Sequence, residues 1–461
     1  MRHNAEAGQL EAHLELELLL GGGRKQPGHN KKAANKTVDN DFVGMYHILM
    51  SDFELKRATG NWVVGDQFWD REVELALFIE RLDEGAHLLL TAPRRIGKTS
   101  LMKEASRRLE DRYLCLYIDL QKAESASDAI VELSLAAHSY KPAWDRIVSV
   151  FQNALKDTIE TVKIKDLSIS LRSGLTPDNW RAKGDQLLEI LAEQDRPVVL
   201  FLDEVAILVN RLLRGSDYLI TPQRKEEVDA FLSWLRANSI RHQGKIRFVV
   251  TGSIGLEPLV RQAGLSATLN TFTPFHLEPW TREVAAGCLG ALSNGYNLTI
   301  TTDAIVEMLD RLGVYIPHHV QMFFDHAYQE ARMAGVQEIS LAMVKTVYQS
   351  SMLGIRGHVE LSHMEERLRM VLGPKLDVLA LDLLTEAAVV GTLTAEATRV
   401  LALVHFGEDW VAPARDVLGI LEHDGYLRSR DGGYLFASAL LKDWWRARFQ
   451  FAYVPATARR K

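Results

Sequence analysis

A lysine stands where an apolar run of the sequence gives way to an amphipathic one, within residues 88–105 (LLLTAPRRIGKTSLMKEA). A strand that ends in a tight loop and enters a helix directs backbone N–H groups and the positive end of the helix dipole at one point, where a polyphosphate fits. Lys98 would supply a point charge for the β and γ phosphates, and the hydroxyl of Thr99 would ligate magnesium. Gly97 lets the backbone approach closely, because it has no Cβ. The stretch therefore predicts a site for a magnesium-bound nucleoside triphosphate.

This loop departs from the general pattern G-x-x-x-x-G-K-[ST] at its first position, where Ala92 stands in place of glycine. Alanine is compatible with the loop if its φ is negative. A chance loop is the alternative for an isolated Gly-Lys-Thr sequence, but here strand, loop and helix follow one another in the required order. The residues expected around the phosphates are Ala92, Pro93, Arg94, Arg95, Ile96, Gly97, Lys98, Thr99 and Ser100.

Two adjacent carboxylates follow the most apolar run of the chain, PVVLFLDEV at 197–205. Asp203 would ligate magnesium or accept hydrogen bonds from its water shell. Glu204 is placed to orient and deprotonate an attacking water. The alternative is that the pair only caps the next helix. The phosphate loop upstream favours the catalytic interpretation.

A hydroxyl at the end of a further strand would hold the attacking water or the γ-phosphate. The run RFVVTGSIG at 247–255 offers Thr251 and Ser253, and we place Thr251 among the catalytic residues. An ordinary turn at the end of the strand is the alternative.

The elements that must position these residues alternate between strands and helices. Apolar runs at 87–93, 113–120, 197–205 and 245–253 predict strands covered on both faces, and helical periodicity separates them. Such alternation is typical of a mostly parallel, right-handed βαβ sheet with helices on both faces. The run KIKDLSISLRSG at 163–174 alternates polar and apolar residues, which predicts a hairpin or an edge strand.

Four regions follow from the changes in composition. Residues 1–41 are expected to be a flexible tail with a short helix at 5–20, and 42–280 the α/β domain. Residues 281–360 read as helical throughout. In 361–461, three helical runs precede a hairpin signal around Asp431, which is the order of a winged helix.

Composition excludes several classes of protein. The chain has 461 residues, of which 47% are apolar and 25% charged, and it contains no apolar run long enough to span a membrane. Its start is laced with Glu, unlike a signal peptide. Cys115 and Cys288 cannot build a disulfide framework or a metal site, so we expect a cytoplasmic protein. A net charge of −6 gives no general attraction to nucleic acid.

Four segments together resemble the archaeal-type ATPases, in the STAND branch of the P-loop NTPases and close to the AAA+ proteins. They are APRRIGKTSL, VVLFLDEVAIL, FVVTGSIGLEPLV and HDGYLRSRDGGYLFASALLKDWWRARF, and the resemblance runs over about 65–449. It implies a P-loop NTPase parallel sheet, a helical lid and a C-terminal winged helix. It also implies an ATPase that binds ATP with Mg2+ and acts as a molecular switch.

The resemblance assigns further residues. FWDRE matches the family's entry segment near adenine, which would place Trp69 and Arg71 beside the base. Arg94 and Arg95 match the family's paired basic residues, which would meet a phosphate or a neighbouring subunit, with a solvated loop charge as the alternative. GVYIPHHVQ resembles the lid motif, which would place Pro317, and with it His318, near the phosphates, although a packed or surface histidine is the alternative for His318.

Two features of related proteins are not found in the sequence. No sensor arginine is identified in the lid, since Arg282 and Arg311 do not stand in an obvious motif. The His-Asp pair that touches ADP in related signalling ATPases is replaced by residues 436–438 (FAS). His423-Asp424 precedes the hairpin and is not expected to be its equivalent.

Three functions are compatible with these residues. The first is an ATP-driven switch that acts on a protein partner or on further copies of the chain, in defence or signalling. The second is a DNA-binding ATPase similar to archaeal replication initiators. It is disfavoured because the presumed recognition helix carries Asp416, Glu422 and Asp424 beside Arg415. The third, a scaffold without turnover, has no need of Glu204. ATP is preferred over GTP because no NKxD motif occurs.

Overall fold

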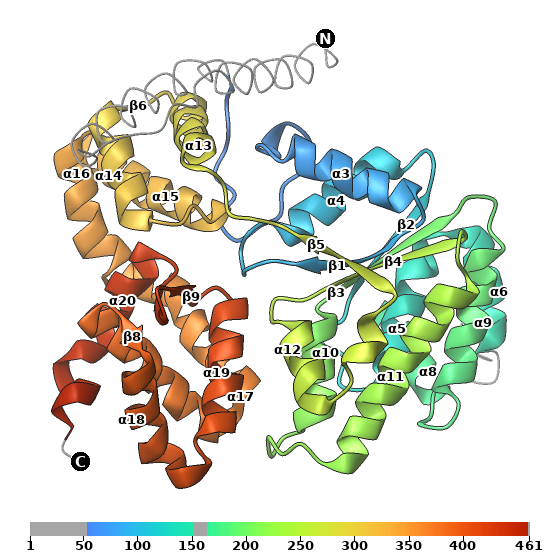
Figure 1. Cartoon of the computed structure of the whole chain (residues 1–461). Helices are drawn as coiled ribbons and strands as arrows, with labels where there is room; N and C mark the ends of the chain where they lie inside the picture. The colour runs from blue at the N-terminus through green and yellow to red at the C-terminus, as the bar shows by residue number, and fades with distance from the viewer. Residues whose placement is uncertain (1–52, 152–163, 460–461) are drawn as a thin grey trace, which may run out of the picture.

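Five parallel strands form the central sheet, in the order β2-β3-β4-β1-β5 (Figure 1). This computed structural model describes residues 53–151 and 164–459, so the predicted tail and its helix at 5–20 lie outside the described residues. The strands are β1 (His87–Thr91), β2 (Leu114–Asp119), β3 (Val198–Asp203), β4 (Ile246–Thr251) and β5 (Phe272–His276). All residues of β3 and β4 are buried, as continuous apolar runs predict for parallel strands.

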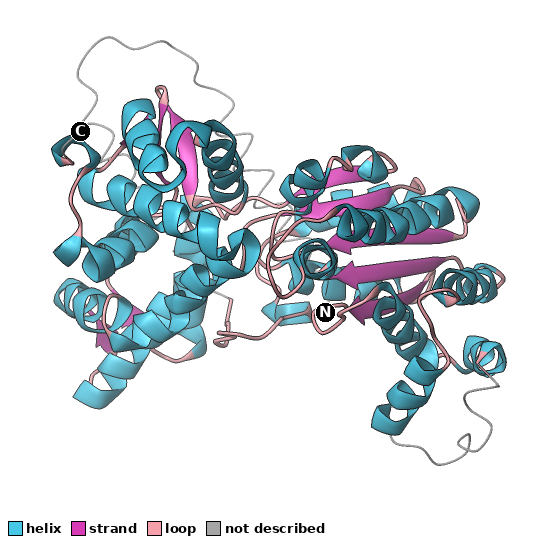
Figure 2. Ribbon diagram, turned by 90° about the horizontal axis from the view of Figure 1, so that it is seen from below, coloured by secondary structure: helices cyan, strands magenta, loops and turns pink. Residues whose placement is uncertain are grey.

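Helices cover both faces of this sheet, and the predicted α/β fold is confirmed (Figure 2). On one face lie α3 (Glu72–Asp83) and α4 (Lys98–Leu109). The other face carries α5 (Ala126–Ala136), α6 (Lys141–Val150), α8 (Ile164–Ser173), α9 (Trp180–Ala192), α10 (Val205–Arg214), α11 (Pro222–Arg241) and α12 (Leu256–Ala263). Alternate strand residues serve the two faces, since Leu88 and Leu90 pack with α3 and α4 whereas Leu89 packs with the opposite core. We call the elements from α3 to β5 the sheet domain.

The segment predicted as a hairpin or edge strand is a helix, and that prediction is wrong. It contains the whole of α8, which packs against α5. Ile169 is exposed and Leu171 is fully buried. A strand would place these two residues on the same face, so only helical periodicity accounts for their different environments.

Helices α13 (Arg282–Gly295), α14 (Thr302–Leu312), α15 (Pro317–Ala334) and α16 (Leu341–Val347) follow the sheet domain, with a short parallel pair β6 (Thr299–Ile300) and β7 (Glu338–Ile339). We call these four helices the lid region. A π-helical turn, Tyr348–Met352, leads from the lid region into the next helix.

The C-terminal module consists of α17 (Ile355–Val390), β8 (Leu393–Thr394), α18 (Ala395–Phe406), α19 (Val411–His423), β9 (Leu427–Arg430), β10 (Gly433–Phe436) and α20 (Ala439–Phe449). The predicted order of three helices and a hairpin is present, and β8 pairs with β10 to complete a three-stranded sheet. The hairpin turns at Asp431 and Gly432, both of which have positive φ. Trp444 and Trp445 are buried in the core of the module.

Helix α17 is kinked at Gly373, whose φ is 73° and ψ 169°, and Pro374 follows it. Proline lacks the N–H that would continue the helical hydrogen-bond ladder, which explains a bend at this point. The predicted boundary near 280 falls between β5 and α13, whereas the one near 360 falls inside α17. The division of the chain into domains stays a prediction.

No helix within residues 53–151 and 164–459 combines the length and the apolar character that a membrane span requires.

Candidate nucleotide-binding site

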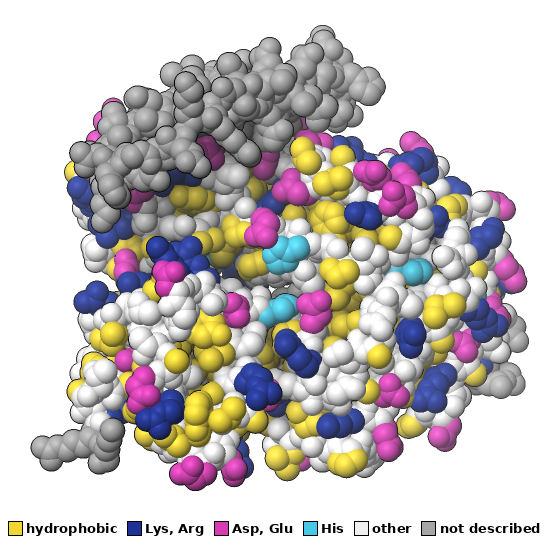
Figure 3. Space-filling view, viewed as in Figure 1, with side chains coloured by type: hydrophobic (Ala, Val, Ile, Leu, Met, Phe, Trp, Pro, Cys, Tyr) yellow, Lys and Arg dark blue, Asp and Glu magenta, His cyan; other side chains and the backbone are white. Residues whose placement is uncertain are grey.

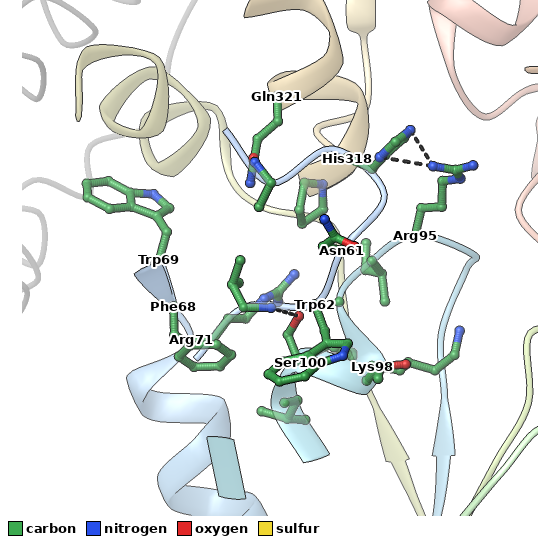
Figure 4. Close-up of a pocket in the computed structure, with 18 of the residues that line it drawn as sticks. Asn61, Trp62, Phe68, Trp69, Arg71, Arg95, Lys98, Ser100, His318 and Gln321 are labelled. Atoms are coloured by element: carbon green, nitrogen blue, oxygen red, sulfur yellow. Dashed lines mark hydrogen bonds between the residues drawn. The ribbon is translucent and has the colours of Figure 1, made fainter. Parts of the chain in front are cut away.

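A cavity of about 400 Å³ lies at the carboxyl ends of β1 and β3, between the sheet domain and the lid region. The carboxyl ends of parallel strands are where ligands bind in open α/β sheets. The predicted phosphate loop and both predicted carboxylates border this cavity, together with the segment 58–63 and the first turn of α15. Figure 4 shows Lys98, Ser100 and Arg71 on one side and His318 and Gln321 on the other.

The loop has the conformation that its glycine predicts. Gly97 has a φ of 102° and a ψ of 20°, in the left-handed region, and caps the N-terminus of α4. Ala92 lies outside that region, so its side chain causes no backbone strain. Lys98 turns back over the loop, where its Nζ donates to the carbonyl oxygens of Ala92 at 2.9 Å and Pro93 at 3.1 Å. These two residues thus contribute carbonyls rather than walls of the cavity.

The cations around the loop are held in a poorly hydrated environment. Lys98 is 8% exposed, and burial lowers the pKa of its ammonium to about 8 against the opposing effect of Glu204 and Asp203. Burial also lowers the pKa of Arg94 to about 10, with a further contribution from the charge of Arg367. Such a cluster of desolvated cations is stabilised by a bound anion.

An oxygen site suited to magnesium lies between α4 and β3. The Thr99 hydroxyl donates to Asp203 Oδ2 at 3.2 Å, and the hydroxyl of Tyr117 on β2 donates to the same oxygen. The pKa of Asp203 is raised above its usual value, mainly by burial. The hydrogen bonds from these two hydroxyls oppose this rise without cancelling it. Magnesium takes hard oxygen ligands and keeps several waters, so a hydroxyl and a carboxylate side by side fit it. The described residues contain no cluster of three or more His, Cys, Asp or Glu that could hold a metal ion.

Glu204 is held by the loop after β4, and the residue that holds it is Ser253. The backbone N–H and the hydroxyl of Ser253 donate to Glu204 Oε2 at 2.9 and 2.6 Å. Thr251, which we placed among the catalytic residues, is instead 1% exposed and does not border the cavity. It is the last residue of β4 and is buried there, whereas Ser253 lies two residues further, in the loop, and borders the cavity. The structure thus favours Ser253 for this position.

One side of the cavity is aromatic, and hydrogen bonds fix several of its residues in place. Trp62, Phe68 and Trp69 border it, as does Arg71 (Figure 4). Arg71 is 5% exposed and donates to Glu74 and to the carbonyl of Glu278, each at 2.7 Å. Its guanidinium therefore joins α3 to the segment that leaves β5.

The segment 58–63 crosses this side and is fixed at both ends. The N–H of Ala58 donates to Gln321 Oε1 of α15 at 2.9 Å, and the N–H of Val63 donates to Ser100 Oγ of α4 at 3.1 Å. Ser100 thus borders the cavity and also holds this segment through its hydroxyl.

The lid region meets the phosphate loop where His318 lies against Arg95. Pro317 is the first residue of α15 and borders the cavity with His318. Arg95 Nη1 lies 2.6 Å from Nε2 and 3.1 Å from Nδ1 of His318 (Figure 4). The structure therefore brings Arg95 and Pro317 to the same edge of the cavity. Arg282 and Arg311 instead pair with Asp310 and Glu307 of α14.

Four contributors to the site were missed from the sequence. Tyr117, Gln321, Arg367 and the segment 58–63 carry no motif. For Tyr117 alone, the order and register of the strands give a signal. They pair Asp119 of β2 with Asp203 of β3, which brings Tyr117 near the carboxylate. Gln321 and Arg367 depend on how distant helices pack onto the sheet domain.

Comparisons with known proteins show similarity in fold. No family model matches the sequence, and no curated protein matches it. A Walker-type ATPase of Pyrococcus abyssi is similar with a TM-score of 0.55 at 17% identity, over 86% of this chain and 99% of that chain. The ORC2 protein of Aeropyrum pernix, solved in ADPNP–ADP complexes, has a TM-score of 0.46 at 13% identity, over 82% of this chain and 93% of its own. The RuvB Holliday junction branch migration motor of Thermotoga maritima has a TM-score of 0.39 at 14% identity, over 80% of this chain and 93% of its own.

At 17% identity the first of these similarities is evidence for the fold only. The chemistry has to be inferred from the residues of the site. The parallel sheet, the loop at the end of β1 and the acidic residues at the end of β3 agree with that topology. The chain has the fold of a P-loop ATPase.

Proposed function

We propose that this protein binds ATP with Mg2+ and hydrolyses it, and that the nucleotide state controls how the lid region and the C-terminal module contact the sheet domain. The observation that carries the proposal is the 3.2 Å contact between Thr99 Oγ1 and Asp203 Oδ2, with Lys98 and Glu204 bordering the same cavity. These two residues stand 104 positions apart in the chain, and a hydroxyl beside a carboxylate is what a magnesium-bound triphosphate needs, which supports the proposal.

Each residue has a defined part in this proposal. Lys98 releases the carbonyls of Ala92 and Pro93 and reaches the β and γ phosphates. Thr99 and Asp203 would hold Mg2+, which would neutralise charge on the phosphate oxygens. Glu204 orients the attacking water and accepts its proton, because its carboxylate is already fixed at the edge of the cavity. Trp62, Trp69 and Arg71 enclose the base.

The contacts between regions support a switch. Arg95 and His318 join the phosphate loop to α15, and Asp424 accepts a hydrogen bond from the N–H of Gly255 in the loop after β4. Both contacts involve loops that border or adjoin the cavity, so a bound nucleotide biases them directly. A protein partner or further copies of this chain would read the resulting change, as in the signalling ATPases that the sequence resembles.

A DNA-binding ATPase is the alternative function. Helix α19, the presumed recognition helix, packs against α12 of the sheet domain, and the charge of Asp416 acts on Arg214 there. Lys and Arg side chains are interspersed with Asp and Glu over the face of the C-terminal module seen in Figure 3. A groove reader needs a free helix and a concentration of positive charge. These observations favour the switch, and salt-sensitive binding of duplex DNA by the full chain would favour the alternative.

The test is turnover of ATP by the full chain, with magnesium and with a chelator. We expect phosphate release with magnesium only, and a change in hydrodynamic size with a non-hydrolysable ATP analogue. GTP is expected to be a poorer substrate. Absence of both ATP binding and turnover would show that the cavity serves another ligand.

The affinity for ATP should be constant up to about pH 8 and fall above it. In the free protein the pKa of Lys98 is lowered to about 8, and phosphate charge favours the ammonium form, so the pKa is higher in the complex. Binding therefore takes up a proton between the two values, and affinity falls by up to ~10-fold per pH unit above the lower one. Calorimetry at about pH 8.5, in two buffers of different ionisation enthalpy, measures this uptake directly. An affinity that stays flat up to about pH 9.5 would contradict it.

A further inference from the structure

The loop between β4 and α12 lies between the proposed base and the C-terminal module. On one side, the N–H and the hydroxyl of Ser253 both donate to Glu204 Oε2. On the other side, Arg367 of α17 donates to Ser253 Oγ through Nη2. Because the serine oxygen accepts from the guanidinium, its single proton is directed to the carboxylate. A chain of hydrogen bonds thus runs from α17 through Ser253 to Glu204.

The same module grips this loop a second time. Asp424 Oδ1, at the end of α19, accepts from the N–H of Gly255 at 3.0 Å. The packing is close, because a Cβ at Gly255 would lie 2.5 Å from Nδ1 of His423. Within the module, Tyr426 donates to the carbonyl of Met364 at 2.7 Å, one turn before Arg367 on α17. The two contacts on the loop therefore belong to one packed unit.

Arg367 is in an unusual setting for a residue that only stabilises the fold. Arg367 is 7% exposed, and its Nη2 donates a hydrogen bond to a neutral group, the hydroxyl of Ser253. Its Nε has no hydrogen-bond partner within the described residues. Its charge acts unfavourably on two neighbouring cations, Arg94 and Lys98. A buried cation without a carboxylate partner costs stability, so its contact with Ser253 needs another explanation.

We propose that Arg367 is a positioning residue for the hydrolysis of ATP. It fixes the rotamer of Ser253, and Ser253 in turn holds the carboxylate of Glu204 at the cavity. The base is in place only while the C-terminal module is docked on the loop 253–255. This inference rests on the proposed function and adds the residue through which the module controls it.

The experiment compares Arg367→Ala, Arg367→Lys and a matched control, Arg369→Ala, which removes an exposed arginine from the same helix. We measure kcat and KM for ATP and, separately, the Kd for a non-hydrolysable analogue. We expect Arg367→Ala to lower kcat by roughly 10- to 100-fold, as misplacement of a reacting group does, and to change Kd less than about threefold. Arg367→Lys should recover part of kcat, since an ammonium can still donate to the serine. Arg369→Ala should match the unmodified protein.

A second variant tests the route through the serine. Ser253→Ala keeps the backbone N–H bond to Glu204 and removes the hydroxyl that Arg367 contacts. We expect it to lower kcat, and we expect Arg367→Ala to add little in the Ser253→Ala background, because the two residues act in series.

The outcomes separate this inference from the function on which it rests. If the unmodified protein hydrolyses ATP and Arg367→Ala does so equally fast, the positioning role is wrong and the proposed function stands. Independent, multiplicative losses in the double variant would also overturn it, as would a loss confined to Kd. If the unmodified protein binds ATP without turnover, the hydrolytic function is wrong and the inference falls with it.

Discussion

Replacement of Lys98 by Ala should weaken ATP binding by about 100-fold or more. Charge-assisted hydrogen bonds of a buried ammonium to two phosphates account for roughly 3 kcal/mol, which corresponds to that factor. The nucleotide-free fold should survive, because the variant also removes a charge that burial destabilises. Calorimetric titration with ATP and magnesium gives the affinity, and a thermal melt without nucleotide gives the stability.

Lys245→Ala is the matched control for this variant. Lys245 is exposed and stands just before β4, at the amino ends of the strands and thus at the opposite end of the sheet from the phosphate loop. It should bind ATP with unchanged affinity. If Lys98→Ala bound as tightly as the unmodified protein, the nucleotide would have to lie elsewhere.

Glu204→Gln should keep ATP affinity and lower the rate of hydrolysis by roughly 100- to 10,000-fold, the usual contribution of a general base. Glutamine keeps an amide oxygen that can accept from the N–H and the hydroxyl of Ser253 at the same place. Glu204 has a φ of 62°, and glutamine, which has the same branching at Cβ, should adopt this conformation as readily as glutamate. The substitution therefore removes basicity with little change of geometry. Single-turnover kinetics with labelled ATP measures the chemical step apart from release.

Glu257→Gln controls for the loss of a carboxylate nearby. Glu257 lies in the first turn of α12, where its Oε2 is 3.3 Å from Nε2 of His423, and it does not border the cavity. It should hydrolyse ATP at the rate of the unmodified protein. Equal turnover by Glu204→Gln would refute the role given to Glu204.

The sequence predicted the parts of the fold that depend on short-range pattern. The strands β3 and β4 follow from unbroken apolar runs, and the loop before α4 follows from the order of its residues. Residues 163–174 were predicted as a hairpin or an edge strand because their alternation fits a period of two, whereas they contain helix α8, in which Leu171 is buried and Ile169 exposed. Local periodicity carries no information about which neighbouring element a segment will pack against.

The candidate site was predictable up to the strand ends and not beyond them. Asp203 and Glu204 follow directly from the apolar run that they end. The choice of Thr251 over Ser253 depended on where β4 stops, which periodicity locates only within a few residues. Arg367 and Ser253 are 114 positions apart in the chain. Acidic residues stand next to Arg367 in the sequence, so no basic cluster marks it as a functional residue. Contacts of this kind come from tertiary packing of helices, which no local pattern encodes.

The bend in α17 has a mechanical consequence. The turns before Gly373 carry Arg367, and the turns after it lie in the core of the C-terminal module. A Cβ at Gly373 would lie 2.9 Å from Cβ of Tyr218, in the connection between α10 and α11, so the bend rests on the sheet domain itself. The two parts of α17 thus meet at a bend whose position is fixed by the contact with Tyr218. If the later turns of α17 tilted about the contact with Tyr218, the turns that carry Arg367 would move as well, and with them the hydrogen bond to Ser253.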